Sequence, residues 1–351
     1  MKKIWIKVIH PAPYTYVWKQ STLEYFDIDF YYDFDESMGK VWKDYYKEKI
    51  NKSNYSLSLI KKIRKALTSD MTILSGWNRK DNLIIALFVS FFSKKKVYFF
   101  ADFPLKENNK FFDFFKYLLI KFLSNGLLSA TQSGVAYFSS KPFMDKKNIY
   151  YLPYGVSVQS CYDDNVITKI ENRKKLKKIF IASNMIPRKG HLFFVDAISQ
   201  LSEKMLSDFE IHFAGHGENA KMIEDKMKDI KVKSIFHGWL SLKEYEQLLS
   251  EIDILVHPSF EEPFGIPPIE AMFFGKIVVV SSGVHSLDGL IKNGSNGFVY
   301  NKDDLEDFKE IFLAAISIDN KSISTNAKIT AENNFGQMQF IHSFKNVSID
   351  K

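Results

Sequence analysis

Two glutamates in residues 257–275 (HPSFEEPFGIPPIEAMFFG) have the type and spacing best suited to binding a ligand. Glu262 precedes a Gly-Ile-Pro-Pro run and Glu270 follows it. Proline is tolerated in the first helical turn, so we expect a helix to open at the prolines, with Glu270 in its first turn. The free N–H groups there favour a phosphate, and Gly265 lets the backbone approach it closely. The carboxylates can accept hydrogen bonds from hydroxyls, such as a sugar on one side and a ribose on the other.

Either glutamate alone has an ordinary explanation, because Glu270 fits a dipole-favoured first turn and Glu262 fits a charged loop. The whole run E-P-F-G-I-P-P-I-E-A-M-F-F-G, however, resembles the E-x7-E signature of the retaining nucleotide-sugar glycosyltransferases of family 4, which have the GT-B fold. The resemblance implies that Glu262 holds the sugar and that Glu270 binds the donor nucleotide. It also implies that Phe264, Gly265 and Ile266 belong to the donor site.

Residues 181–190 (IASNMIPRKG) resemble the strand–loop–helix segment with which this family binds the donor diphosphate. Lys189 falls on the family's lysine, whereas the family's usual arginine, five residues earlier, is replaced by Asn184. Either Arg188 supplies the missing charge or the phosphate site is weaker. Alternatively, Arg188 and Lys189 are exposed cations in the first turn of a helix, an arrangement that the helix dipole disfavours.

Two further segments resemble the family's donor site. Residues 213–218 (FAGHGE) resemble its glycine-rich turn, so we expect Gly215 near the donor. The segment also fits the dinucleotide fingerprint G-x-G-x-x-A, but it follows the second strand of its domain instead of the first. His237, Gly238 and Trp239 fall where the family places its nucleobase pocket, although Trp239 equally fits ordinary packing.

The first half resembles the family less closely. Gly76, in a Ser-Gly-Trp segment after a strand, resembles the glycine turn that faces the donor phosphates. Many members have a Gly-Gly pair after the first strand, but residues 10–13 here are HPAP. Asp102 lies at a strand end where members often carry a histidine, so we expect it to orient or deprotonate the acceptor hydroxyl. Its alternative role is to cap the next turn.

We expect no metal and no cofactor, since the family mechanism that the resemblance implies demands neither. Residues 27–29 and 33–35 are D-x-D strings like the metal motif of the other large glycosyltransferase fold, but such strings are common by chance. The sequence contains no P-loop, no HExxH and no paired cysteine spacing.

Short strands alternate with helices along the chain, which predicts two parallel sheets covered by helices. The expected strands are residues 4–9, 28–32, 72–74, 97–101, 127–130 and 149–152 in the first half, and 178–182, 210–214, 234–237, 254–257, 278–281 and 297–300 in the second. We therefore expect the α/β GT-B class, with two doubly wound Rossmann-like domains facing across a cleft. Residues 1–156 form the acceptor-binding domain, 157–319 the donor-binding domain, and 320–351 helices that pack back on the first.

Composition narrows the class of protein further. Of 351 residues, 46% are hydrophobic and 25% charged, which excludes a disordered chain. The single cysteine, Cys161, excludes a disulfide framework and fits a reducing compartment. With no signal peptide and no run long enough to span a bilayer, we expect a cytoplasmic protein, soluble or peripheral at the inner face of the cell membrane.

The first 150 residues contain 25 basic and 14 acidic side chains, which suggests an anionic partner. Residues 57–67 form an amphipathic run, and residues 111–115 are rich in phenylalanine. These segments fit either a core face with solvated lysines or contact with an anionic membrane. The basic residues expected to make that contact are Lys61, Lys62, Arg64 and Lys65. No recognised nucleic-acid module accompanies the charge, so we expect no nucleic-acid partner.

Taken with the resemblance, these features predict transfer of a sugar from a nucleotide-sugar donor to a hydroxyl of a glycan or lipid-linked acceptor, with retained anomeric configuration, in bacterial surface polysaccharide synthesis. Two alternatives stay open. A GT-B isomerase would act on a nucleotide sugar without an acceptor, and a non-catalytic relative would only bind sugar or lipid. The intact E-x7-E string argues against both, whereas Asn184 favours the second.

Overall fold

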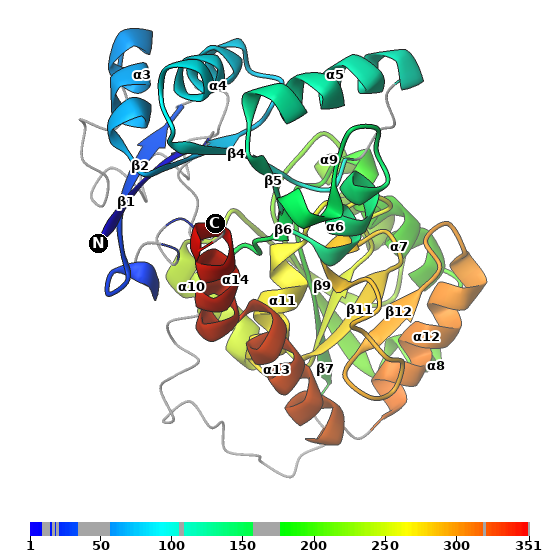
Figure 1. Ribbon diagram of the computed structural model, residues 1–351. Coiled ribbons are helices and arrows are strands. Elements are labelled where there is room, and N and C mark those ends of the chain that lie inside the picture. The colour runs from blue at the N-terminus through cyan, green and yellow to red at the C-terminus, as the bar shows by residue number, and fades with distance from the viewer. Residues whose placement is uncertain are drawn as a thin grey trace. The chain divides into compact units, whose positions relative to one another are not determined.

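The computed structural model describes residues 1–8, 15, 18, 21–33, 57–104, 109–156, 176–318 and 321–349. The chain divides into two compact units, which Figure 1 shows as two sheets flanked by helices. Unit 1 consists of Met1–Ser157 and Phe335–Lys351, and unit 2 of Val158–Asn334. The HPAP loop, Asp35 and Cys161 lie outside the described residues.

Unit 1 is built on a six-stranded parallel sheet with the order β2-β1-β3-β4-β5-β6. Its strands are β1 (Lys2–Val8), β2 (Phe26–Tyr32), β3 (Met71–Ser75), β4 (Lys96–Ala101), β5 (Gly126–Ser129) and β6 (Ile149–Tyr151). The helices between them are α3 (Leu59–Thr68), α4 (Lys80–Phe92), α5 (Lys110–Leu123) and α6 (Gln132–Ser139), with a 3₁₀ turn at Lys146–Asn148. The inner strands are buried along most of their length because parallel sheets carry helices on both faces.

Unit 2 repeats the design with the order β12-β11-β10-β7-β8-β9, again all parallel. Its strands are β7 (Lys177–Ala182), β8 (Phe209–Ala214), β9 (Lys233–Gly238), β10 (Ile254–His257), β11 (Ile277–Ser281) and β12 (Phe298–Tyr300). Its helices are α7 (His191–Ile198), α8 (Glu203–Leu206), α9 (Ala220–Lys228), α10 (Leu242–Glu251), α11 (Ile266–Phe273) and α12 (Leu305–Ser317), with 3₁₀ turns at Pro187–Lys189 and His285–Leu287. All twelve strands coincide with the runs expected from the sequence, which confirms the predicted alternation.

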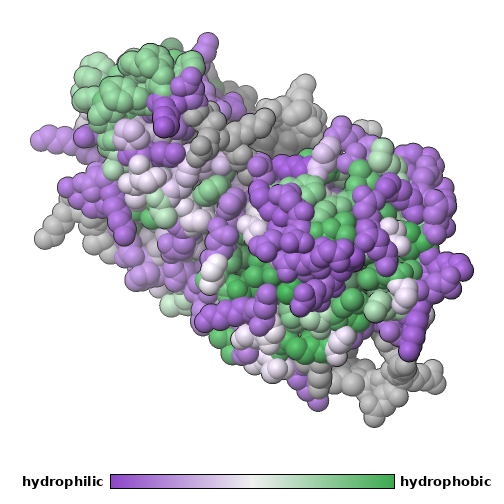
Figure 2. Space-filling model, turned by 90° about the vertical axis from the view of Figure 1, so that its right-hand side faces the viewer, coloured by the Kyte–Doolittle hydropathy of each residue, from purple (hydrophilic) through white to green (hydrophobic). Residues whose placement is uncertain are grey.

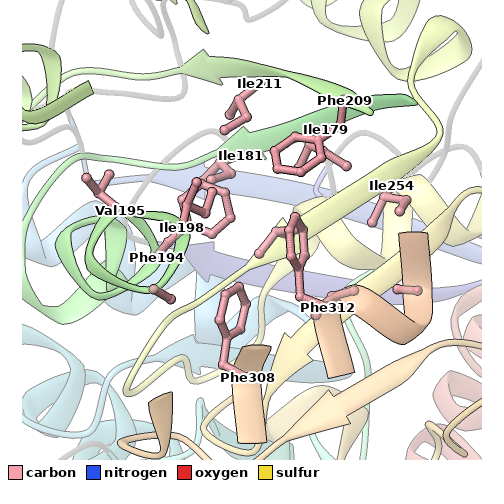
Figure 3. Close-up of a cluster of buried hydrophobic side chains, with 14 of the residues drawn as sticks. Ile179, Ile181, Phe194, Val195, Ile198, Phe209, Ile211, Ile254, Phe308 and Phe312 are labelled. Atoms are coloured by element: carbon pink, nitrogen blue, oxygen red, sulfur yellow. The ribbon is translucent and has the colours of Figure 1, made fainter. Parts of the chain in front are cut away.

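A phenylalanine-rich core fixes the unit 2 sheet. Phe308 and Phe312 of α12 are fully buried, and Figure 3 shows them beside sheet residues such as Ile179 and Phe209. The rings of Phe209 and Phe312 meet edge-on, with centroids 5.6 Å apart. Burying such side chains stabilises the fold by about 1.5–3 kcal/mol each, so this core holds the strand ends at fixed positions.

The two C-terminal helices belong mostly to different units. Ser324 of α13 (Lys321–Phe335) hydrogen-bonds to Gly275, and both lie in unit 2. In α14 (Gln337–Ile349), the Phe340 ring stacks on Trp18 at 5.5 Å, and both lie in unit 1. The segment 320–351, expected to pack as a whole on the first domain, therefore divides between the units. Within the described residues, no helix is long and apolar enough to cross a bilayer.

Candidate functional site

The strand order of unit 2 creates a switch point between β7 and β10. From β7 the chain moves outward through β8 and β9, and it returns on the other side of β7 as β10. Loops that leave two such strands diverge above the sheet, which is where open α/β sheets bind ligands. The segment with Lys189 follows β7, and the E-x7-E segment follows β10. Two motifs 73 residues apart in the sequence therefore meet at one sheet edge.

Three of the predicted residues are brought together there. The Lys189 ammonium donates a hydrogen bond to Glu262 Oε2 and forms an ion pair with it. Arg188 Nη1 lies 3.8 Å from the same oxygen and donates to the Glu261 carbonyl at 2.7 Å. The Lys189 side chain is only 13% exposed, so this residue is not a solvated surface cation, whereas the Arg188 side chain is 36% exposed. Both cations lie in a separate 3₁₀ turn before α7 and not in its first turn, because Gly190 ends that turn in a left-handed conformation.

The charge state of Glu262 follows from these neighbours. Burial alone would raise the pKa of Glu262, but the contact with His257 and the charge of Lys189 outweigh it and hold the pKa at about 2. His257 Nε2 lies 3.5 Å from Glu262 Oε2 and 3.2 Å from Ser259 Oγ. Burial also lowers the pKa of the Lys189 ammonium, while Glu262 opposes that change. The site therefore holds an ionised acceptor beside cations that point at it.

Backbone bonds to a neighbouring loop keep Glu262 in place. The Glu262 N–H donates to the Gly283 carbonyl at 2.8 Å, and the Glu262 carbonyl accepts from the His285 N–H at 3.1 Å. Gly265 then caps α11 with φ 83°, a left-handed conformation that favours glycine. A Cβ at Gly265 would lie 2.9 Å from Val284 Cγ1, so the turn requires glycine on steric grounds as well. Phe264 is buried, and Ile266 is the first residue of α11.

Glu270 is not in the first helical turn as expected. Because Gly265 is the cap and α11 begins at Ile266, Glu270 is the fifth residue of the helix. Its carboxylate instead accepts a 2.7 Å hydrogen bond from the Tyr245 hydroxyl of α10. Burial raises the pKa of Glu270 to about 7, although the bond from Tyr245 opposes the shift. The two glutamates of the motif thus differ, one firmly ionised and one that titrates near neutrality.

The glycine turns after β8 and β9 lie next to each other. The Gly215 N–H donates to the Gly238 carbonyl at 2.8 Å, and a Cβ at Gly215 would approach the Ser183 carbonyl to 2.1 Å. His237 Nε2 lies 2.9 Å from His212 Nδ1, and the two rings stack. The Trp239 side chain is 52% exposed, so it does not serve as core packing. These ends of β7, β8 and β9 form one continuous edge.

Asn184 lies on the same edge but carries no charge. It follows β7, its side chain is exposed, and its carbonyl accepts from the Ile186 N–H at 2.9 Å. The next residue along, Met185, donates from its N–H to the His216 carbonyl at 3.0 Å, which joins this loop to the glycine turn. Arg188 and Lys189 are the cations that the described residues place beside Glu262 on this edge.

In unit 1, Gly76 follows β3, just as Gly215 follows β8 in unit 2. It adopts φ 85°, and its N–H donates to the Phe100 carbonyl at 3.1 Å. Asn82, the third residue of α4, donates from its side-chain amide to both the Ser75 and Gly76 carbonyls, at 2.8 and 2.7 Å. Lys7 in turn donates to Asn82 Oδ1 at 2.6 Å. The buried Lys7 thus supports the glycine turn indirectly, through Asn82.

Lys7 is the centre of a buried ion network that the sequence did not reveal. Its ammonium pairs with Asp33 and, at 2.9 Å, with Asp81. Lys62 contacts both carboxylates at 3.1 Å, and Arg79 contacts Asp33 at 3.3 Å. The Lys7 side chain is 1% exposed, and burial lowers its pKa. These charges neutralise one another inside the unit.

Asp102, the expected acceptor-side group, follows β4. The Tyr154 hydroxyl donates to Asp102 Oδ1 at 2.7 Å, while the Tyr154 ring stacks on Trp18. The Asp102 residue itself is exposed. A carboxylate fixed by a phenol and open to solvent can accept a proton or a hydrogen bond from a ligand hydroxyl.

The D-x-D strings serve other purposes in the described residues. Asp29 pairs with Lys65 at 2.5 Å, and Asp33 belongs to the Lys7 network. Within the part of the chain that the structure describes, no group of three or more histidine, cysteine or acidic side chains is arranged to hold a metal ion.

Sequence reasoning missed three residues that shape these sites. Tyr245 lies 25 positions before Glu270 on another helix, so no local pattern connects the two. Lys7 resembles an ordinary strand residue in the sequence, since its partners come from two other segments, the end of β2 and the start of α4. His257 did carry a signal, because it ends the strand immediately before the E-x7-E segment.

The second unit matches a known family. Residues 163–330 match the family model described as glycosyl transferases group 1. A 129-residue stretch is 33% identical to an uncharacterized glycosyltransferase, MJ1607, of Methanocaldococcus jannaschii, and covers 36% of this chain and 32% of that protein. A 144-residue stretch is 23% identical to a Campylobacter jejuni alpha-1,4-N-acetyl-D-galactosaminyltransferase whose name gives a diNAcBac-PP-undecaprenol-linked substrate. It covers 41% of this chain and 40% of that enzyme, so the matches span well under half of these relatives.

The fold similarity extends over the whole chain. The crystal structure of Anabaena HepE in complex with UDP-glucose superposes with a TM-score of 0.74 and 15% identity, covering 100% of both chains. The chain therefore has the GT-B fold, as the sequence predicted. The match of residues 163–330 to the glycosyl transferases group 1 model confirms the family resemblance seen in the second half of the sequence.

Proposed function

We propose that the protein is a retaining glycosyltransferase that moves a sugar from a nucleotide-sugar donor to a hydroxyl of a glycan or lipid-linked acceptor. The observation that carries the proposal is the pairing of Lys189 and Arg188 with Glu262 at the switch point of unit 2. A diphosphate needs cations, and a sugar hydroxyl needs an acceptor. The site offers both, because Lys189 and Arg188 are cations and Glu262 is an acceptor. In the empty site these groups bind each other.

Donor binding would exchange these partners. The diphosphate takes Lys189 and Arg188 together with the N–H of Ile266, the first residue of α11, because the next two residues are prolines and have no N–H. Glu262 is then released to accept hydrogen bonds from the sugar. Glu270, fixed by Tyr245, accepts from the ribose, and Gly215 and Gly238 let backbone approach the nucleotide. Lys189, Arg188 and Glu262 thus keep charged or polar partners in both the empty and the occupied site.

The chemistry proposed is a same-face displacement. The bond between the anomeric carbon and the departing diphosphate oxygen breaks, and the acceptor oxygen bonds to that carbon from the same side. The acceptor proton passes to the diphosphate oxygen that leaves. The chain's cations stabilise the charge that develops on this oxygen, a contribution that often lowers a barrier by several kcal/mol. We propose that Lys189 and Arg188 do this without a metal ion or cofactor, and that Asp102 of unit 1 orients the acceptor hydroxyl.

The substrates are proposed from the relatives. UDP-glucose is bound in the HepE structure, and an undecaprenol-linked glycan is named for the Campylobacter enzyme. A lipid-linked acceptor would place the enzyme at the inner face of the cell membrane, in the cytoplasm, in the synthesis of a bacterial surface polysaccharide. The excess of basic residues in the first 150 positions suits that anionic surface.

A donor panel tests the proposal. The purified chain is screened against nucleotide sugars with different bases and sugars, with and without glycan acceptors, and the anomeric configuration of any product is read by NMR. We expect one donor to be consumed faster with acceptor present and to give a retained product, without dependence on divalent metal. Glu262→Gln should lower turnover, whereas Glu332→Gln, at an exposed position of α13, is the matched control.

Three results would contradict the proposal. Donor rearrangement without an acceptor would indicate a GT-B isomerase. Nucleotide-sugar binding without turnover under any acceptor would indicate a non-catalytic relative. An inverted product would exclude the same-face route and the role given to Glu262.

A further inference from the structure

The outward faces of α4 and α5 in unit 1 are made of large apolar side chains. On α5, three charged or polar side chains are turned toward the protein, while Lys110 and Lys121 are exposed: Asp113 and Tyr117 are buried, and Lys116 lies over the Trp77 ring at 4.2 Å. Phenylalanine and leucine take the solvent side instead. This is the reverse of an ordinary surface helix, in which the polar face points outward. The exposed apolar residues are Ile84, Leu87, Phe88, Phe91 and Phe92 on α4, and Phe111, Phe112, Phe114, Phe115, Leu119 and Phe122 on α5.

These side chains form one surface, hereafter the α4–α5 surface. The two helices are adjacent, since Ser90 of α4 donates to the Leu123 carbonyl of α5 at 2.8 Å. The Phe111 and Phe115 rings contact each other at 4.9 Å, and those of Phe88 and Phe92 stack at 5.5 Å. Figure 2 shows a hydrophobic area at the height where Figure 1 places these helices. An exposed apolar patch of this extent marks a site of interaction.

Its exposure is large where the side chains are largest. Phe91 and Phe92 are 72% and 74% exposed, and Phe111, Phe112 and Phe122 are 65–70% exposed. Single exposed apolar residues are common on proteins, but a group on two neighbouring helices is not. These rings contact one another on the surface and are not part of the buried core of unit 1. They therefore add little to its stability.

The charges around the α4–α5 surface are mainly basic. Residues 80–123 contain eight lysines against four acidic residues. The acidic residues of the two helices are already paired inside the unit: Asp113 with Lys116 and Lys141, and Asp81 with Lys7 and Lys62. The exposed lysines beside the apolar faces are Lys80, Lys94, Lys110 and Lys121. An apolar centre with a basic rim complements a bilayer that contains anionic lipid.

We propose that the α4–α5 surface inserts into the interface of a bilayer containing anionic phospholipid. The assignment differs from the sequence-based one, which placed the basic contact on α3. Lys62 is occupied by Asp33 and Asp81, and Lys65 by Asp29, so two of those four cations are engaged within unit 1. A bilayer fits better than a second copy of the chain, because two copies face to face would oppose their basic rims.

This inference specifies the membrane part of the proposed function, but its test needs neither donor nor acceptor. The full chain is mixed with vesicles of neutral phosphatidylcholine, or of phosphatidylcholine with a quarter phosphatidylglycerol, and bound protein is measured by sedimentation at low and high salt. We expect binding to the anionic vesicles that weakens about tenfold or more in high salt. Failure of sugar transfer would not change this result, so the two proposals can fail separately.

Two variants locate the contact. Phe91→Ser combined with Phe111→Ser and Phe122→Ser should reduce binding to anionic vesicles about tenfold or more, since the apolar term is lost. Lys110→Glu with Lys121→Glu should reduce it mainly at low salt. The control is Met222→Ser with Ile329→Ser, which changes exposed apolar residues of unit 2 and should leave binding unchanged. Melting curves and nucleotide binding verify that each variant is folded.

The proposal is overturned if the native chain ignores anionic vesicles at low salt, or if the phenylalanine variant binds them as well as the native chain does. It is equally overturned if the native chain is a dimer that the phenylalanine variant converts to a monomer while vesicle binding is absent. That outcome would assign the α4–α5 surface to a second copy.

Discussion

Each unit places a lysine at the switch point of its sheet, and the two lysines have opposite surroundings. Lys7, near the end of β1, is 1% exposed and is bound by Asp33, Asp81 and Asn82. Lys189, after β7, is 13% exposed and pairs with Glu262, beside an Arg188 side chain that is 36% exposed. Burial lowers the pKa of both ammonium groups. The same fold position therefore carries a closed network in one unit and an open pair in the other.

The difference separates a structural charge from one available to a ligand. The Lys7 network joins β1, α3 and α4 and supports the glycine turn at Gly76, so its partners cannot leave without loosening the unit. Lys189 has a single acidic partner that belongs to a ligand-binding motif, with a second cation at hand. We propose that a phosphate replaces Glu262 there, which would leave the contacts within the sheet unchanged.

The largest expected effect comes from breaking the closed network. Lys7→Met removes the buried cation that contacts Asp33, Asp81 and Asn82. Lys62 and Arg79 still contact the two carboxylates, so we expect a cost below the roughly 3–5 kcal/mol of a buried charge left unpaired. We expect a clear fall in the melting temperature of unit 1. Lys65→Met is the control, because its pair with Asp29 is exposed and such pairs contribute about 0–1 kcal/mol. Equal effects of the two substitutions would mean that the buried network is not structural.

A smaller effect, on ligand affinity and turnover, is expected from the open pair. Lys189→Met should weaken binding of nucleotide diphosphate and slow transfer by roughly 10- to 150-fold, the value of a hydrogen bond to a charged group. Calorimetry with UDP and donor consumption measure the two quantities. Lys204→Met, at an exposed position of α8, should change neither. If the Lys189 variant binds nucleotide diphosphate and transfers sugar at the native rate, Lys189 is not the ligand-binding counterpart of the structural Lys7.

The pH dependence of stability distinguishes the two motif glutamates. The pKa of Glu270 is raised from 4.5 to about 7, so the folded chain holds a proton that the unfolded chain has released. Relative to Glu270→Gln, the native chain should lose stability as pH rises from 4.5 to about 7 and stay lower above that. Glu262 behaves in the opposite way: its pairing stabilises above pH 4.5, and this is lost as pH falls toward 2. Melting temperatures from pH 4 to 8 check the first trend, which a constant difference would contradict.

The smallest expected effect concerns the arginine beside the open pair. Arg188→Ala should slow transfer about two- to fivefold, because a partly exposed cation contributes little. In the double variant with Lys189→Met, the losses should exceed the product of the single effects, since one cation covers for the other. Asn184→Arg should then recover activity in the Arg188 variant. Strict additivity would show that Arg188 does not replace the absent arginine.

The sheets could be predicted from sequence because their strands are short apolar runs separated by helical patterns. In β11, Ile277–Ser281 is buried throughout, so its composition alone marks a central strand. The family resemblance assigned Lys189 and Glu262 to one site, but their ion pair depends on the strand order that brings the two strand ends together, which the sequence did not predict.

What the sequence did not disclose depends on contacts between distant segments. The environment of Glu270 is set by Tyr245 on another helix, and the start of α11 moved because the left-handed Gly265 caps it ahead of the prolines. The basic run on α3 indicated a solvent-facing patch, but Lys62 turns inward to carboxylates from other elements. The sequence shows how many cations a segment contains, whereas packing decides which of them pair with carboxylates inside the protein.

The return of α14 to unit 1 has a consequence for the order in which the chain acquires structure during synthesis. Phe340, Phe344 and Val347 are fully buried in unit 1, and Lys2 donates to the Ser348 carbonyl at 2.6 Å. Domains usually fold in the order in which they leave the ribosome. Here the unit that is begun first cannot close its core until residues 340–347 have emerged, whereas unit 2 is complete by residue 334. We therefore expect the second unit to finish folding first, while the first 157 residues still have part of their apolar surface uncovered.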